Sequence, residues 1–335
     1  MLKLNSLQRL LKRKRTAKKT KRCRRLLSRI SEFDKQRMQK FSGPFRDEQK
    51  ASLAYAIGME YHRVEKGLTM PSMRLGFGQP IVSGLIDLIR QYIQNGGSIN
   101  DFEIHHALKV IAEYHQLHIE ENYRLDDELN KKITQVLSEY PSVPSQQRKM
   151  TPASLWQAVG SDFKAFSASR HSVRHVEGKV PTQDIIESIS LAQNAPSACN
   201  RQYVKVTLVE NYDLVQKILA LQNGNKGFGH LVEQLLLLTV DLRAIRWLAE
   251  RHDVYTNAGV FAMNLSYALH YHKIAHCMLN WSVEEEPDRE LREMLSIPDH
   301  ENVVLMFMLG NAPANFKVPL SPRRPLMEIL TIVDK

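Results

Sequence analysis

Residues 195–202 read Ala-Pro-Ser-Ala-Cys-Asn-Arg-Gln and lie between a predicted helix and a predicted strand. The helix should begin after Pro181 with Thr182 as its N-cap and should end near Asn194, because a proline disfavours α geometry in the residue before it. Its expected buried side chains are Ile185, Ile186, Ile189 and Ala192. The polar side chains of the loop either face a ligand from a rigid support or satisfy their own turn.

Upstream of this loop, residues 170–174 read Arg-His-Ser-Val-Arg, after a predicted helical stretch at 155–166. Two arginines and a serine within one turn provide the cationic forks and the hydroxyl that a phosphate ester requires. A solvated surface cluster is the alternative interpretation of this segment.

Downstream of the loop, the pattern alternates between short β-rich runs and helical segments. The runs are at 204–210, 235–241 and 303–309. A helix is expected to open at Asn257, with small and apolar residues at Ala258, Phe261, Ala262, Leu265, Ala268 and Leu269. This alternation predicts an α+β or α/β domain.

The part before residue 150 differs in character. Helix-like apolar spacing at 51–64, 81–93, 102–123 and 126–137 predicts an all-α domain. A Pro-Ser-Val-Pro-Ser segment begins at residue 141 and is typical of a linker. The predicted organisation is therefore a basic arm at 1–44, a helical domain at 45–140, a linker at 141–150 and an α+β domain at 151–335.

The net charge of +10 comes from the arm. Thirteen of the 46 Lys and Arg residues lie in residues 1–30, which contain no acid, so the remaining 33 basic residues face 36 acidic ones, a net charge of −3. Such a run repels itself and is expected to be disordered or a solvated helix. Leu4, Leu7, Leu10 and Leu11, then Leu26, Leu27 and Ile30, could give it an apolar stripe for an anionic membrane surface. Nucleic-acid phosphates are an equal alternative, and an arm without a dedicated partner is the third.

Composition favours a soluble protein, since 43% of residues are apolar and no apolar run approaches the roughly 18 residues of a membrane span. The three cysteines are few and widely spaced, and no secretory signal is evident. We expect a cytoplasmic protein, which the arm could hold peripherally at a membrane.

Taken together, the segments at 170–174 and 195–202 resemble the opening of the FMN-dependent nitroreductase family. Later segments agree in order: the helix from Asn257, then Ala-His-Cys-Met-Leu-Asn-Trp at 275–281, then Leu-Gly-Asn at 309–311 and Pro-Arg-Arg-Pro-Leu at 322–326. The resemblance implies a nitroreductase-like mixed sheet flanked by helices, with the all-α domain preceding it. It also implies FMN bound at the interface of an intertwined homodimer.

The resemblance implies specific cofactor contacts. Arg170, Ser172 and Arg323 would bind the phosphate, with Arg324 as a substitute for Arg323, and His171 and Arg174 would lie near the ribityl chain or ring. Pro196, Ser197, Asn200 and Gln202 would face the flavin, with backbone groups of Leu279 and Asn280 near its N5 edge. Asn225 or Lys226 would approach the pyrimidine end. NADH or NADPH would reduce the flavin, which would then reduce a small-molecule electron acceptor such as a nitro compound, a quinone or a metabolite. No side chain would act as a nucleophile, and Cys199 is interpreted as a small packing residue.

The chain departs from the family in one region. Relatives carry a helical lid between the middle strand and the central helix, whereas about sixteen residues separate Asp241 from Asn257 here. We hypothesise that the helical domain replaces the lid, with residues 61–71 on the substrate side; a solvated helix end is the alternative.

Two other patterns in the sequence do not indicate a binding site. His105, His106, His115 and His118 lack the partners of a zinc site, and the Gly-Phe-Gly segments at 76–78 and 227–229 lack a nucleotide-binding fingerprint. Two further functions remain open: a flavin-binding or degenerate scaffold tethered by the arm, or binding by the arm as the primary function.

Overall fold

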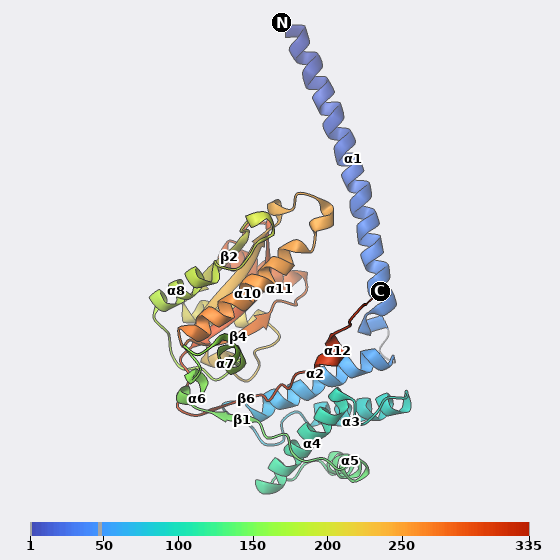
Figure 1. Ribbon diagram of the computed structural model, residues 1–335, viewed down its shortest axis with the longest axis vertical. Coiled ribbons are helices and arrows are strands. Elements are labelled where there is room, and N and C mark those ends of the chain that lie inside the picture. Colours follow the sequence, from blue (N-terminus) through green and yellow to red (C-terminus); the bar gives the residue numbers. More distant parts are fainter. Residues whose placement is uncertain (1, 46–48, 335) are drawn as a thin grey trace.

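The computed structural model describes residues 2–45 and 49–334, and for residues 2–15 it describes the backbone alone. The chain is an α+β protein, as predicted, with a helical N-terminal part and a sheet-containing C-terminal half (Figure 1). No helix in the described ranges is long and apolar enough to cross a membrane.

The basic arm is a single helix, α1 (Leu2–Phe41), which runs away from the rest of the molecule (Figure 1). The side chains of residues 16–29 are all exposed. The predicted stripe of Leu4, Leu7, Leu10 and Leu11 lies among side chains outside the described set. A short 3-10 turn, η1 (Gly43–Phe45), follows the helix.

Four helices form the helical domain: α2 (Lys50–Leu68), α3 (Gln79–Gln94), α4 (Phe102–Glu120) and α5 (Asp127–Glu139). Each overlaps a predicted helix. Their apolar stripes meet in one core that includes Ile57, Ile89, Ile111 and Tyr114, all fully buried.

A four-stranded antiparallel sheet of order β2-β3-β5-β4 organises the C-terminal half. Its strands are β2 (Val204–Val209), β3 (Gln234–Asp241), β4 (Ala275–Asn280) and β5 (Glu301–Gly310). On β3, Leu235 and Leu237 join the core on one face of the sheet, and Leu236 and Leu238 join the core on the other. Both faces are covered, so the strand is apolar throughout and does not alternate with polar residues.

Helices cover the two faces of the sheet. The face with Leu236 packs against α8 (Thr182–Ala192) and α10 (Asp253–Tyr271). The opposite face packs against α9 (Tyr212–Leu221) and α11 (Glu285–Leu295). Short 3-10 turns lie in the connections: η2 (Ala198–Asn200), η3 (Gly229–Leu231), η4 (Leu242–Ala244) and η5 (Leu248–Glu250).

Three helix predictions need correction. The stretch 155–166 is two helices, α6 (Pro152–Trp156) and α7 (Phe163–Ser169), separated at Gly160, whose positive φ of 89° a helix cannot continue. In α8, Pro181 is the N-cap in place of Thr182, and Ile186 is 51% exposed. Helix α10 begins at Asp253, which places Asn257 inside it, where its side chain bonds the 195–202 loop.

The segment predicted as a linker is anchored at several points. The side chain of Glu113 on α4 accepts hydrogen bonds from the backbone N–H of Gln147 (2.9 Å) and from its side chain (2.9 Å). Strand β1 (Arg148–Met150) then pairs antiparallel with β6 (Phe316–Val318). After β6 the chain runs along α2 and ends beyond α12 (Leu326–Ile329) (Figure 1). The two halves are thus joined by the C-terminal tail as well as by the linker.

Candidate functional site

A cavity of about 760 Å³ lies where the two halves meet. We call it the cationic cavity, because four arginines line it and no Asp or Glu is among its described lining residues. The arginines are Arg148, Arg170, Arg174 and Arg323, and the other polar groups include His62, His171, Ser172 and Tyr267. The resemblance named Arg170, His171, Ser172, Arg174 and Arg323, and the structure brings these five residues together.

The backbone after α7 explains how this segment presents its side chains. Arg170 has the extended conformation that ends the helix (φ −71°, ψ 123°). In an extended chain successive side chains alternate in direction. Val173 points into the core, and its N–H donates to the carbonyl of His276 on β4 (2.9 Å). Its neighbours Ser172 and Arg174 line the cavity.

The cavity holds positive charge that nothing in the described chain neutralises. The described residues provide no ion pair to any of the four arginines, and Arg323 donates to the backbone oxygen of Ser321 (2.8 Å). Burial lowers the pKa of the Arg170 guanidinium, and the charge of Arg323 lowers it further. Burial, followed by the charges of Arg148, Arg170 and Arg323, lowers the pKa of His171 to about 4. His171 is therefore a neutral hydrogen-bonding group at pH 7.

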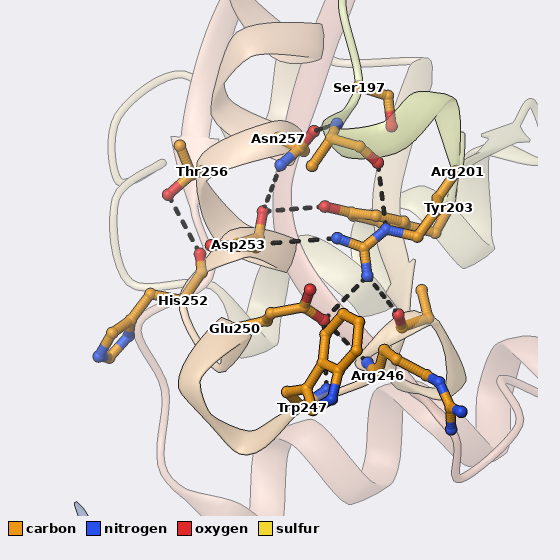
Figure 2. Close-up of polar contacts among 12 residues, drawn as sticks. Ser197, Arg201, Tyr203, Arg246, Trp247, Glu250, His252, Asp253, Thr256 and Asn257 are labelled. Carbon is orange, nitrogen blue, oxygen red and sulfur yellow. Dashed lines mark hydrogen bonds and ion pairs between the residues drawn. The ribbon is translucent and has the colours of Figure 1, made fainter.

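The 195–202 loop lines a separate, smaller pocket of about 100 Å³. Pro196, Ser197 and Gln202 contribute to it, together with Asn257 and Phe261 of α10. Ser197 Oγ accepts the N–H of Gln202 (2.9 Å). Asn257 Oδ1 accepts the N–H of Ala198 (2.7 Å) (Figure 2). These two hydrogen bonds hold the loop.

The backbone of this loop is unusual. Cys199, Asn200 and Gln202 all have left-handed φ angles, of 52°, 52° and 49°. Each such residue costs of order 1–3 kcal/mol and persists where surrounding contacts impose it. Cys199 is exposed, so its interpretation as a packing residue is wrong: the left-handed turn directs it to solvent. Asn200 accepts a hydrogen bond from the Gln202 side chain (3.0 Å).

Arg201 holds the loop, a role that the sequence did not reveal. Its guanidinium donates to the carbonyl of Ala244 (2.7 Å) and to Glu250 Oε2 (3.0 Å), and its Nε donates to the carbonyl of Ala198 (3.1 Å) (Figure 2). The segment between Asp241 and Asn257 is too short to form a lid. Its residues Ala244 and Glu250 instead accept hydrogen bonds from this arginine. The signal in the sequence was the pair of acids within that short segment, Glu250 and Asp253, both of which form ion pairs with Arg201.

The segment before β3 positions Asn225 and Lys226. Asn225 Nδ2 donates to the carbonyls of Leu219 (2.6 Å) and Gln222 (2.7 Å), so this amide closes its own turn. Lys226 is exposed. Gln222 Nε2 donates to the backbone oxygen of Asn280 (2.9 Å), which ties the turn to the end of β4.

The predicted residues therefore fall into three groups within one chain. The cationic cavity is one, the 195–202 loop is the second, and the end of β4, with Leu279 and Asn280, is the third. Neither described pocket contains residues of the β4 end. Arg324 does not line the cationic cavity. It forms ion pairs with Glu103 of α4 and with Glu328, and its guanidinium lies over the ring of Tyr55.

Residues 61–71 lie against the C-terminal half, in agreement with part of the lid hypothesis. His62 lines the cationic cavity. Burial lowers the pKa of Lys66, and the charge of Arg174 lowers it further. Met70 packs beside the 222–229 turn, where a Cβ on Gly227 would meet its sulfur at 3.0 Å. Whether this surface contacts a substrate stays a prediction.

Of the four histidines named from the sequence, His115 and His118 form hydrogen bonds within the helical domain. His118 Nδ1 donates to the carbonyl of Tyr114 (2.7 Å), and its Nε2 accepts the N–H of Gly76 (2.9 Å). His115 bonds Asn130 (3.1 Å), and His105 is exposed. Within the described residues, no group of three or more His, Cys, Asp or Glu side chains could hold a metal ion.

Several solved structures are similar to part of this chain. No protein-family model matches the chain, and no curated protein matches it. Structures similar to it include a nitroreductase family protein from Streptococcus pneumoniae, 22% identical, with a TM-score of 0.45 and coverage of 51% of this chain and 100% of that one. A putative NADH oxidase from Clostridium acetobutylicum is 19% identical, with a TM-score of 0.44 and coverage of 51% and 99%.

An FMN-dependent nitroreductase from Clostridium difficile is also similar, at 17% identity, a TM-score of 0.39 and coverage of 46% of this chain and 89% of that one. These names agree with the resemblance found in the sequence. The match covers about half of this chain and leaves the N-terminal helical part unmatched. The ligand of this chain is therefore inferred from its own residues.

Proposed function

We propose that this chain is an FMN-dependent oxidoreductase that uses NADH or NADPH to reduce a small molecule. The observation that supports it is the cationic cavity, in which four arginines and Ser172 converge without a carboxylate. Arginine forks and hydroxyls are the donors that phosphate monoesters prefer in proteins. Its volume lies within the range of about 300–1,000 Å³ typical of ligand sites.

The residues fit the phosphate of FMN on chemical grounds. A buried guanidinium such as Arg170 is costly without a counter-charge, and a phosphate would supply one. Arg170, Ser172 and Arg323 would hold the phosphate, and His171, being neutral, would offer a hydrogen bond to a hydroxyl without adding charge. When bound, FMN would supply hydride acceptance and donation at its ring, for which the protein provides position and electrostatics.

We further propose that the complete site needs a second copy of the chain. Within one chain the cationic cavity and the 195–202 loop line different pockets. A homodimer would let Ser197, Asn200 and Gln202 of one copy approach the ring of a flavin whose phosphate lies in the cavity of the other. The preformed loop, held by Arg201 and Asn257, suits such a contact because it needs no rearrangement.

The test begins with the purified full-length chain. We expect FMN to bind, giving a yellow protein that NADH or NADPH bleaches without air. Arg170→Ala should weaken FMN by about 10-fold or more, since hydrogen bonds to charged groups are worth about 1.5–3 kcal/mol, and should leave riboflavin affinity nearly unchanged. Arg289→Ala, on the exposed face of α11, is the matched control. A colourless protein that cannot be reconstituted with FMN would refute the proposal.

A second function is favoured by the exposed helix α1. Its side chains at 16–29 include seven Lys and Arg and no acid, and all of them face solvent. We propose that this arm tethers the protein to an anionic surface, a membrane or a nucleic acid, and that the protein works in the cytoplasm or peripherally at the membrane. Yellow protein that neither nicotinamide bleaches would favour a tethered flavin-binding scaffold over an enzyme.

A further inference from the structure

Glu65 of α2 is a carboxylate with no exposed surface, at the junction of the two halves. Its Oε1 lies 2.8 Å from Nε2 of His106 on α4 and accepts the backbone N–H of Ser321 (3.3 Å). Its Oε2 lies 3.2 Å from Nδ1 of His62. One side chain of the helical domain thus holds a core histidine, a cavity histidine and the C-terminal tail.

The charge of Glu65 is maintained by its partners. Burial alone would raise the pKa of this carboxyl, but hydrogen bonds with His106 and His62 outweigh burial and hold the pKa below its ordinary value. A buried carboxylate is stable only with a cationic or hydrogen-bonded partner. The Glu65 anion is therefore stabilised by the hydrogen bonds with the two imidazoles that flank it.

The bond to Glu65 fixes the direction of the His62 ring. Nδ1 faces the carboxylate as a donor, so Nε2 is the nitrogen left for another partner. The His62 side chain retains 37% exposure and lines the cationic cavity. No other hydrogen bond of its ring is found among the described residues.

Glu65 also holds a second segment that lines the cavity, at Ser321. Ser321 has a left-handed φ of 41°, and its N–H points at Glu65. Leu320 N–H donates to the side chain of Gln147 (2.8 Å), which is itself bonded to Glu113 of α4. Two acids of the helical domain therefore hold the tail segment that carries Arg323: Glu65 directly and Glu113 through Gln147.

We propose that His62 is a ligand-contacting residue of the cationic cavity, that its Nε2 forms a hydrogen bond with the phosphate end of the bound flavin, and that Glu65 positions it. This inference rests on the proposed function for the identity of the ligand. It assigns to the helical domain a direct part in holding the cofactor, beyond covering a substrate pocket.

The experiment compares FMN, riboflavin and inorganic phosphate as ligands of the full-length chain and of His62→Gln. We expect His62→Gln to weaken FMN by about 10-fold near pH 7, the loss of one charge-assisted hydrogen bond, and to leave riboflavin within about 2-fold. His105→Gln, an exposed histidine on α4, is the matched control.

Glu65→Gln tests the positioning role. It keeps the shape of the side chain and removes its charge, so we expect FMN affinity to fall at least as far as in His62→Gln. Far-UV circular dichroism checks that the variant is folded. A folded Glu65→Gln protein that binds FMN with wild-type affinity at every pH overturns the role of Glu65.

The outcomes separate this inference from the proposed function. Equal FMN affinity of His62→Gln and wild type at every pH overturns the inference, and so does an equal loss for FMN and riboflavin, which would place His62 away from the phosphate. If the wild type binds phosphate but no flavin, the proposed function fails, and the role of His62 stands only if His62→Gln loses phosphate binding. If the wild type binds none of the three ligands, both fail.

Discussion

His276 and His270 are buried in the C-terminal half as neutral imidazoles, and we predict that mild acid destabilises this half. His276 Nδ1 donates to the carbonyl of Ile274 (2.9 Å), so its Nε2 must accept from the hydroxyl of Ser266 (2.8 Å). Burial lowers the pKa of His276 to about 3, and burial followed by the charge of Arg170 lowers that of His270 to about 4.

The sign and size of the effect follow from proton binding. The unfolded imidazoles bind protons below about pH 6.5 and the folded ones do not, so stability is complete above about 6.5 and declines as pH falls toward the folded pKa values. At pH 5 each histidine is about 1.5 units below its unfolded pKa, which at 1.36 kcal/mol per unit is about 2 kcal/mol. The two together amount to about 4 kcal/mol, a large part of the roughly 5–15 kcal/mol of a typical domain.

His276→Asn tests this reasoning, because its amide can still donate to Ile274 but cannot titrate. All three tryptophans, Trp156, Trp247 and Trp281, lie in the C-terminal half, so their fluorescence during urea unfolding follows that half. We expect the stability loss from about pH 7.5 to pH 5 to be about 2 kcal/mol smaller in His276→Asn than in the wild type. His230→Asn, at an exposed position, should match the wild type. An unchanged acid loss in His276→Asn would refute the assignment of a neutral buried imidazole.

Gly67→Ala should lower the free energy of unfolding of the helical domain by about 1–3 kcal/mol, because its Cβ would meet the ring of Phe77 at 2.0 Å. Gly84→Ala, inside α3 with open space around it, should instead stabilise by about 0.5–1 kcal/mol; equal effects at the two positions in thermal unfolding would contradict the packing argument. Arg251→Ala removes a bidentate ion pair with Asp34 (2.7 Å for each bond) that fastens α1 to the C-terminal half. We expect faster amide hydrogen exchange around residues 248–252 with a global stability change under about 1 kcal/mol, and unaltered exchange there would show that the pair does not hold the helix.

Local patterns predicted most of the helices and three of the four main strands. The strand β4 was not predicted as one, because His276 and Asn280 interrupt its apolar residues and its burial comes from both faces of the sheet. The group at 170–174 could be predicted because its residues are adjacent in the chain and share one extended segment. Asn225 closes its own turn through its Nδ2 group, and a sequence does not tell whether an amide bonds its own turn or a ligand. Its contact with the flavin stays a prediction.

Long-range contacts account for what the sequence could not reveal. Glu65 lies in a polar stretch that is equally consistent with a solvated helix end. Its burial depends on His106, 41 residues away, and on Ser321, 256 residues away. Arg201 likewise acquires its role from Ala244 and Glu250, which only the folded chain brings to it.

The helix α1 sets a distance between the two proposed functions, tethering by the arm and reduction at the cavity. At 1.5 Å of rise per residue, Lys18 lies about 24 Å along the helix from Asp34, where the ion pair with Arg251 fastens it. A partner bound to the cations near Lys18 would stand well beyond the reach of any side chain in the cavity. Such a partner would decide where in the cell the reaction takes place and would not compete with the molecule being reduced, so trimming the arm should relocate the protein without altering its turnover in solution.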